Sequence, residues 1–468
     1  MKKLSALFLL WALAFTGFGQ EYTSKRNNIT FNHSNGLSSF NVEMRGKIDI
    51  TDDDKDIKGM SADAYLEINK TIFGSRRTIV ISPDGNGLRR EYYEGREKMP
   101  WEPDGRQWLS EILPELLRTT TIAAESRVNR FYKRGGVSAV LSEIKLIESD
   151  YVKAHYANVL MGLNLAVKDY ATVIQSVTST MDSDHYMTEF LEKNMGKFLQ
   201  DKSATDAVFN ACGKMDSDHY KTEVIKEALD HQTPTAEGIA AILLASSNME
   251  SDHYKTEVLT SLLKKENLND AVINEMIKGT MSIESDHYRS VVLKRALNKP
   301  GLSPTSFKNV VESVKEIESD HYKTEVLTDL LNNKLSNDVN QAIVLISENI
   351  ESDHYKTIIL NDLVKRQNLD DASFRKLIEV GSNGDSDHYS SQFLQTALSL
   401  PNLSNTQVAA VIAAAGNLDS DHYLTEVLVR AAPKVRASTD NTLREAYRAA
   451  AKRIESETYY GRAMRAIE

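Results

Sequence analysis

From residue 149 onwards, apolar and polar positions form blocks that recur about every 34 residues. In the copy at 251–284, the first block places its apolar residues on one side of a helical wheel, which predicts a helix ending near Glu266. A polar break follows, and a second apolar block predicts a helix from Asp270 to about Thr280. One pair of such helices cannot bury both apolar faces, so consecutive pairs are expected to stack.

Each block begins with a version of Ser-Asp-His-Tyr-Lys-Thr-Glu-Val-Leu, the form found at 251–259. A period of 20–50 residues is typical of stacked-repeat proteins. We therefore predict a mainly α fold, a HEAT-like α-solenoid of about nine 34-residue two-helix repeats, preceded by a small antiparallel β module. The repeats should occupy 149–455, followed by a polar C-terminal cap at 456–468. The aspartates of the motif, interpreted as helix-capping and structural, are Asp184, Asp218, Asp252, Asp286, Asp320, Asp353, Asp387 and Asp421.

Capping residues support both helices of the repeat. At the first helix, the Ser or Asp side chain of the motif is expected to accept hydrogen bonds from free backbone N–H groups of the first turn. At the second helix, Thr233-Pro234 and Ser303-Pro304 place a cap before a proline at the first helical position. Ser404 and Gln407 have the spacing of a capping box.

Residues 20–100 show alternating apolar and polar positions, which predict half-buried strands in an antiparallel β-rich module. The alternation is clear around Val42 and Met44 and again at Ile79 and Ile81, and glycine-containing turns separate the segments. The cluster from Asp52 to Asp54 lacks the ligand spacing of a calcium loop and is interpreted as a solvated turn.

Residues 101–148 change to a helical pattern and are predicted to form an adaptor that caps the N-terminal end of the stack. Trp108 belongs to the first apolar stripe, in which Pro114 is expected to kink or end a turn. A helix from Arg118 to Tyr132 should stop at Gly135-Gly136, and another should run from Val137 to Ile147.

The first nineteen residues have the composition of a signal peptide, assigned to 1–19. Lys2 and Lys3 precede an apolar run that is too short for a membrane span. We therefore expect an exported protein of the periplasm or the extracellular space. The formal net charge of −10 argues against binding to nucleic acid. Cys212 is the only cysteine, so an intramolecular disulfide is impossible.

Eight of the eleven histidines occupy one motif position, on the side of the wheel that faces away from the apolar stripe. In five copies a glutamate follows four residues later. These pairs could form a surface ladder for a ligand, or they could be structural, with His and Asp bonding to the neighbouring repeat and His–Glu stabilising the helix. The candidate ladder comprises His185, His219, His253, His287, His321, His354, His388, His422, Glu189, Glu223, Glu257, Glu325 and Glu426.

No metal or cofactor is predicted for this ladder. Zinc requires three or four ligands about 2 Å from the ion, whereas equivalent residues of adjacent repeats lie roughly 10 Å apart. The motif tyrosines, from Tyr186 to Tyr423, border the apolar stripe and are interpreted as packing residues between repeats. The row of aromatic and histidine side chains could also hold a glycan or an extended peptide.

Several short segments resemble those of a known family. They are Arg45–Asp49, Asp52–Asp54, Arg106–Leu109, Leu113-Pro114, Arg127-Val128, Gly135–Leu141 and Ile147–Tyr151. In these segments the chain resembles the extracytoplasmic C-terminal region of bacterial membrane metallopeptidases of the β-lactam-sensor, antirepressor type, and related secreted repeat proteins. The His-Glu-x-x-His zinc motif of those peptidases is absent, so the resemblance implies only a sensory or binding role in the bacterial envelope.

A residue that recurs in every repeat is a poor catalytic candidate, because catalysis needs one constellation in one pocket. We therefore expect a non-enzymatic, exported scaffold that binds a protein or peptide along the solenoid surface. One alternative is an envelope sensor for glycan or cell-wall fragments. The other is a hydrolase with a site where the β module meets the first repeats.

Overall fold

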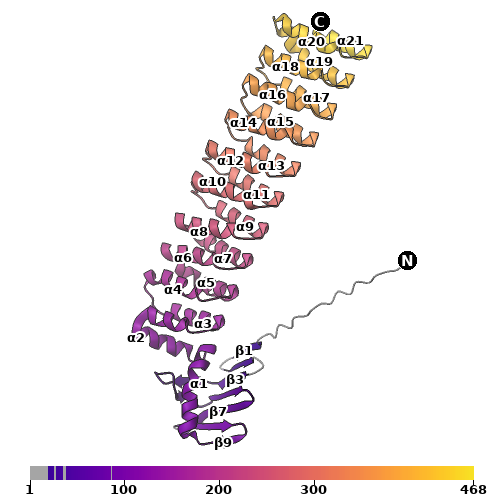
Figure 1. Cartoon of the computed structure of the whole chain (residues 1–468). Helices are drawn as coiled ribbons and strands as arrows, with labels where there is room; N and C mark the ends of the chain where they lie inside the picture. The colour runs from indigo at the N-terminus through magenta and orange to yellow at the C-terminus, as the bar shows by residue number, and fades with distance from the viewer. Residues whose placement is uncertain (1–18, 26–27, 35–37, 86) are drawn as a thin grey trace, which may run out of the picture. The chain divides into compact units, whose positions relative to one another are not determined.

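The computed structural model describes residues 19–25, 28–34, 38–85 and 87–468 (Figure 1). It forms two compact units, Met1–Ala211 and Cys212–Glu468. The predicted signal peptide lies outside the described residues except for Gly19, which begins the first strand. Among the helices of the described ranges, none combines the length and the apolar character that crossing a membrane requires.

The first unit begins with a seven-stranded antiparallel sheet in the order β1-β2-β3-β6-β7-β8-β9. The antiparallel β module is therefore confirmed, although β1, β2, β5 and β9 were not predicted. Strands β4 and β5 form a separate two-stranded ribbon. The bounds are β1 (Gly19–Lys25), β2 (Asn28–Ser34), β3 (Ser38–Arg45), β4 (Ile48–Ile50), β5 (Ile57–Met60), β6 (Tyr65–Ile72), β7 (Ser75–Asp84), β8 (Gly87–Glu94) and β9 (Glu97–Met99).

A short π-helical turn, η1 (Trp101–Gly105), leads into α1 (Arg106–Thr119), which packs against the sheet. Its apolar stripe, including Trp108 and Leu113, shares one core with strand residues such as Leu66 and Ile79. Pro114 lies inside α1, so the helix does not end at this proline. Burial of Leu113 and Leu116 stabilises the helix despite the backbone hydrogen bond lost at Pro114.

The adaptor continues in α2 (Ala124–Ile144). It begins later than the predicted Arg118 because α1 runs on to Thr119 and a turn intervenes. Gly135 and Gly136 break its helical geometry, as predicted; Gly136 has a φ of +63°, which favours glycine. The second half of α2 is followed by the first repeat, and α2 contacts both α3 and α4.

Nine helix pairs and a final helix follow within the described residues, which confirms the fold class. In the first unit these helices are α3 (Asp150–Met161), α4 (Tyr170–Thr178) with the preceding η2 (Val167–Asp169), α5 (Asp184–Phe198) and α6 (Lys202–Cys212), whose last residue opens the second unit. The second unit continues with α7 (Asp218–His231), α8 (Ala236–Ser247), α9 (Asp252–Leu263), α10 (Asp270–Gly279) with η3 (Thr280–Ser282), α11 (Asp286–Leu297), α12 (Pro304–Lys315), α13 (Asp320–Leu330), α14 (Asn337–Glu348), α15 (Asp353–Arg366), α16 (Asp371–Ser382), α17 (Asp387–Leu398), α18 (Asn405–Ala415), α19 (Asp421–Ala437), α20 (Asn441–Ala451) and α21 (Glu457–Ile467).

Within the second unit, each pair stacks on the next (Figure 1). First helices contact first helices, as in α11 with α13, and second helices contact second helices, as in α10 with α12. Apolar residues such as Val258, Leu262 and Ile277 are fully buried between them. Helix α9 ends at Leu263, three residues before the predicted Glu266, because the residues that follow Leu263 are polar and Asn267 adopts a left-handed turn conformation.

Capping of the second helices follows the prediction with one exception. Ser303 caps α12 ahead of Pro304, and Ser404 with Gln407 forms a complete capping box on α18. The predicted cap at Thr233 is wrong, because α8 begins two residues later and Thr235 accepts the hydrogen bond from Gly238.

Candidate functional site

The motif aspartates link neighbouring repeats, which is one of the two structural roles predicted for them; in the contacts described they do not cap their own helices. Asp286, the first residue of α11, accepts hydrogen bonds from the backbone N–H groups of Glu318 and Ser319, which precede α13. The motif serines in front of the first helices, such as Ser319, make no side-chain capping bond. The same bond to the next repeat is made by Asp150, Asp218, Asp252, Asp320, Asp353, Asp387 and Asp421.

The lysine of the motif is a residue that sequence reasoning missed. Lys255 is buried, and its ammonium lies 3.8 Å from Asp252 and donates to the carbonyl of Ser282 at 2.9 Å. Arg289 replaces it in the next repeat and donates to the carbonyl of Ile283. The sequence did contain a signal for this residue, namely a basic residue three positions after the motif aspartate. It balances the carboxylate and satisfies a carbonyl at the end of the repeat.

The opposite ends of the first helices are also joined. Lys299 donates to the carbonyl of Lys265 at 2.7 Å, and Lys434 donates to that of Leu400 at 2.9 Å. At another junction Gln367 makes the equivalent bond to Leu331. Cations here suit the negative end of the helix dipole. Polar bonds at both ends therefore set the register of successive first helices.

In the second unit, the motif histidines and tyrosines form a continuous ladder along the starts of the first helices. Each histidine ring contacts the tyrosine that follows it in sequence, with centroids 5.0–5.3 Å apart. It also contacts the tyrosine of the next repeat, with centroids 5.5–5.9 Å apart. We call the rings from His219 to Tyr459 the His–Tyr ladder. In the first unit, His185 contacts Tyr186, which also contacts Tyr151.

All eight predicted histidines are exposed, and the tyrosines beside them are partly buried. His219, His253 and His321 have side chains 53%, 51% and 50% exposed. The structure therefore brings the histidines together only through the intervening tyrosine rings. One imidazole edge per repeat faces solvent.

The predicted His/Glu pairs form only in part. His219 lies 3.5 Å from Glu223, and His253 and His321 lie 4.0 and 3.8 Å from Glu257 and Glu325. Glu257 and Glu325 also pair with lysines of the preceding repeat. Glu426 instead pairs with Arg462 at 2.8 Å, and Glu189 is an exposed residue of α5.

An exposed acidic residue precedes each motif serine and accompanies the ladder. In the second unit these residues are Asp216, Glu250, Glu284, Glu318, Glu351, Asp385, Asp419 and Glu455. Between α11 and α13 the surface forms an open hollow of about 490 Å³. Its lining includes His287, Tyr322, Glu284, Glu316 and Glu318. The ladder is thus an exposed aromatic row bordered by carboxylates.

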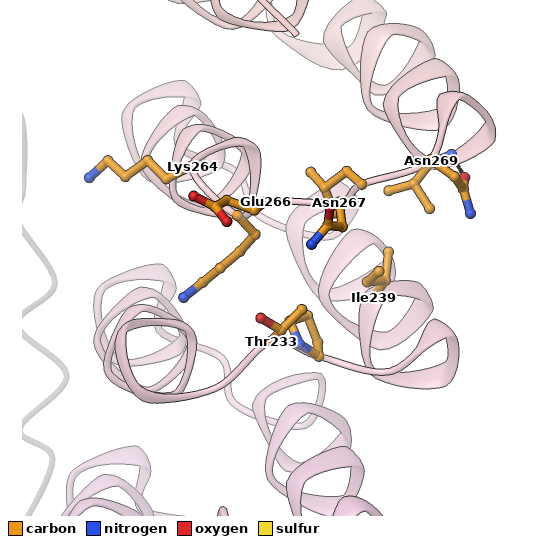
Figure 2. Close-up of a pocket in the computed structure, with 10 residues that line it drawn as sticks. Thr233, Ile239, Lys264, Glu266, Asn267 and Asn269 are labelled. Carbon is orange, nitrogen blue, oxygen red and sulfur yellow. Dashed lines mark hydrogen bonds between the residues drawn. The ribbon is translucent and has the colours of Figure 1, made fainter. Parts of the chain in front are cut away.

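A second hollow, of about 430 Å³, lies on the opposite ends of the first helices (Figure 2). Figure 2 shows Thr233 in the loop after α7, Glu266 and Asn267 in the loop after α9, and Ile239 of α8 among its lining residues. Lys264 and Lys265 also line it, but its residues include neither histidine nor cysteine. Its charged groups are the ammonium groups of Lys264 and Lys265 and the carboxylate of Glu266.

A buried ionic cluster joins the β module to the adaptor in the first unit. Arg127, 1% exposed, donates to Asp54 at 2.9 Å, to Glu143 at 2.7 Å and to the hydroxyl of Tyr156. Arg130 pairs with the same Asp54. Asp52 is exposed, but Asp54 is only 14% exposed, so the solvated-turn interpretation is wrong for Asp54. The carboxylate is buried because two arginines from α2 pair with it.

Neighbouring charged groups keep Arg127 and Glu143 of this cluster ionised. Burial opposes the charge on Arg127, yet Tyr156, Asp54 and Glu143 together raise its pKa. Burial alone would raise the pKa of Glu143, but Arg118 and Arg127 outweigh it and hold that pKa below its usual value. A buried arginine that pairs with two carboxylates and a tyrosine hydroxyl is typical of a structural joint.

A cleft of about 510 Å³ lies where the β module meets the first repeats, which is the place expected for a hydrolase site. Phe31, Phe40 and Leu146 line it together with Glu115, Arg118 and Glu148, and its remaining residues are Thr119 and Ser149. The lining contains neither histidine nor cysteine. Elsewhere in the described ranges, three or more His, Cys, Asp or Glu residues do not gather in a geometry that could hold a metal ion.

Comparisons with known proteins add little to this geometry. No protein-family description matches the sequence. No curated protein is similar to it. One solved structure similar to the chain comes from work titled "Computational Design of Self-Assembling Cyclic Protein Homooligomers", at 13% sequence identity and a TM-score of 0.11. The match covers 68% of this chain and 93% of the designed one.

Proposed function

We propose that the chain is a non-catalytic scaffold whose His–Tyr ladder binds an extended segment of a partner protein. The observation that carries this proposal is the repetition of an exposed imidazole beside a tyrosine ring in successive repeats of the second unit. Hydrogen bonds between repeats explain the Asp and the Lys of the motif, whereas the motif histidines keep about half of their surface exposed to solvent, as in His219, His253 and His321. Exposed residues repeated at one site are suited to binding.

The chemistry of the ladder favours a basic segment. The row of carboxylates that accompanies it includes Glu284, Glu318 and Glu351. Lysine or arginine side chains could pair with these carboxylates while their stems lie on the tyrosine rings. Such charge complementarity speeds encounter and selects partners.

The distance between successive repeats predicts how the basic residues are spaced in the partner's sequence. Packed helices are about 8–10 Å apart, and an extended chain advances about 3.3 Å per residue. One repeat therefore corresponds to about three residues of an extended segment. The favoured partner carries a basic residue at every third position.

Fluorescence anisotropy with a labelled peptide tests this proposal. The peptide carries lysine at every third position, and its control has the same composition with the lysines clustered. We expect tighter binding of the periodic peptide, lost when His253, His287, His321 and His354 are replaced by alanine. His231→Ala is the matched control, because His231 is 61% exposed but lies outside the ladder. Equal binding of both peptides, or binding unaffected by the quadruple substitution, contradicts the proposal.

The remaining expectations stay within the same proposal. Export to the periplasm or cell exterior is supported by the composition of residues 1–19. A glycan-sensing role is the alternative that the tyrosine row favours. Soluble cell-wall fragments that compete with the periodic peptide, and bind more tightly than it does, would support that role.

A further inference from the structure

The motif lysine binds its ammonium group at a fixed place between two repeats. At the α9–α11 junction, the ammonium of Lys255 lies near Oδ1 of Asp252 and donates to the carbonyl of Ser282, which is 27 residues further on. Lys153 makes the equivalent two contacts at the α3–α5 junction. The motif aspartate and this carbonyl therefore form a site for one ammonium group.

The α11–α13 junction does not fill this site with a residue of its own. Arg289 stands in place of the lysine, and its Nε and Nη2 both donate to the carbonyl of Ile283, which precedes its own helix. The equivalent aspartate is Asp286, and the equivalent carbonyl is that of Glu316. Among the contacts of the described residues, Asp286 bonds two backbone N–H groups through Oδ2, and the Glu316 carbonyl accepts no hydrogen bond. Oδ1 of Asp286 and this carbonyl are therefore acceptors without the lysine that neighbouring repeats supply.

The exchange of lysine for arginine lowers the stability of the junction. Arg289 is 6% exposed, and in the described structure its Nη1 is buried without a hydrogen-bond partner. A buried donor that stays unsatisfied is destabilising. Arg289 also lines the hollow of about 490 Å³ between α11 and α13. A departure from the repeat that lowers stability is expected at functional positions.

The same junction carries an additional carboxylate. Glu316 is exposed and lies three residues before the motif serine. At this position the other repeats of the second unit have neutral or basic residues, which are Lys214, Asn248, Ser282, Asn349, Asn383, Asn417 and Arg453. Glu284 and Glu318 line the hollow as well, and among the described contacts the carboxylates of these three glutamates have no ion-pair partner. With Asp286, four carboxylates against one guanidinium give the hollow a formal charge of −3 when His287 is neutral.

We infer that this hollow is the anchoring pocket of the His–Tyr ladder and binds the ammonium group of one lysine side chain of the partner segment. The ammonium donates to Oδ1 of Asp286 and to the Glu316 carbonyl, and the lysine stem lies against the rings of His287 and Tyr322. An ammonium is compact and its donors rotate, whereas a guanidinium needs a planar set of acceptors, so the pocket favours lysine over arginine. The inference rests on the proposed function and names the partner residue that is bound most tightly.

Two substitutions that restore residues of the neighbouring repeats test the inference. Arg289→Lys supplies an internal ammonium to the pocket, and Glu316→Asn removes the additional carboxylate. In fluorescence anisotropy, each should weaken binding of the peptide with lysine at every third position about tenfold. The melting temperature should stay unchanged or rise, because both new residues occur at these positions in other repeats. Glu275→Asn is the control, since Glu275 is 61% exposed and lies outside the hollow.

A peptide with arginine in place of every lysine measures the selectivity of the pocket. It should bind the wild type about tenfold more weakly than the lysine peptide, and this difference should disappear in Arg289→Lys. Equal binding of the lysine peptide to the wild type and to both variants overturns the anchoring pocket and leaves the proposed function intact. A wild type without preference for lysine over arginine overturns the pocket too.

A small probe tests the pocket without the ladder. N-acetyl-lysine methylamide at millimolar concentration should shift the ring C–H NMR signals of His287 in the wild type but not in Arg289→Lys. N-acetyl-norleucine methylamide, which lacks the ammonium, is the control and should leave these signals unchanged. If the lysine probe gives this result while the periodic peptide fails to bind, the pocket stands and the proposed function fails. Unchanged His287 signals, or equal shifts in the wild type and Arg289→Lys, overturn the pocket.

Discussion

Asp286 and Ser319 lie 33 residues apart in sequence, and a hydrogen bond of 2.8 Å joins the Ser319 N–H to the Asp286 carboxylate. The bond connects the start of one first helix to the start of the next. It recurs at successive junctions, as between Asp252 and Ser285. The motif is therefore repeated in part because each copy must bind its neighbour.

Removing this carboxylate should loosen the junction. Asp286→Ala leaves the N–H groups of Glu318 and Ser319 without an acceptor, and we expect a loss of about 2 kcal/mol in the free energy of unfolding. Urea denaturation measures it. Asp338→Ala is the control, because Asp338 is 75% exposed and only pairs with Lys308, and it should have little effect. Equal effects of the two substitutions would refute the role assigned to Asp286.

Substitution in the ionic cluster around Arg127 should destabilise the first unit strongly. Arg127→Met removes the common partner of Asp54 and Glu143 and leaves them only Arg130 and Arg118, so we expect a loss of about 3 kcal/mol in unfolding free energy. Arg127→Lys should lose less unfolding free energy than Arg127→Met but remain below the wild type, because an ammonium cannot make the forked contacts of a guanidinium. Chemical denaturation provides the measurement. A neutral Arg127→Met substitution would show that the cluster is dispensable.

Glu143 should make stability depend on pH. Its folded-state pKa is lowered, so between the folded and unfolded values the unfolded chain binds more protons. Its contribution is complete above the unfolded value of about 4.3 and is lost as pH falls through the folded value. The stability difference between the wild type and Glu143→Gln should therefore shrink on acidification through this window. A difference that is constant with pH would contradict the lowered pKa.

The motif threonines give a test of buried polarity. The hydroxyl of Thr256 is buried without a hydrogen-bond partner, whereas that of Thr324, at the same motif position, donates to the carbonyl of Asp320 at 2.7 Å. Thr256→Val should be neutral or stabilising by up to about 1 kcal/mol, since it removes an unsatisfied hydroxyl. Thr324→Val should lower stability relative to Thr256→Val, because it removes a hydroxyl that makes a hydrogen bond. Thermal melts of the two variants compare them directly, and the reverse order would be inconsistent with the assigned hydrogen bonds.

The regular part of the fold was predictable because its signals are local and repeated. The apolar spacing around Val258 and Ile277 predicts both helices of a pair, and the capping box at Ser404 marks a helix start to the residue. The helical wheel of the motif also predicted that the histidines are exposed. Such signals depend only on neighbours within a few turns of the chain.

Long-range contacts were not predictable in this way. Asp286 at the start of a helix fits both a helix cap and a bond to the neighbouring repeat, and only the three-dimensional stack shows that its carboxylate is used by the next repeat. Asp54 sits in an acidic run typical of solvated turns, but arginines 73 and 76 residues away bury it. The ring contacts between His253 and Tyr288 likewise depend on the packing distance between helices.

The most direct test of the ladder follows the histidine rings themselves. The ring C–H signals of the full chain are recorded by NMR while the peptide with lysine at every third position is added. Binding at the ladder predicts shifts for histidines such as His253, His287 and His321, and none for His155 or His231, which lie outside it. Unchanged ladder signals at saturating peptide, or equal shifts at His231, would contradict the account.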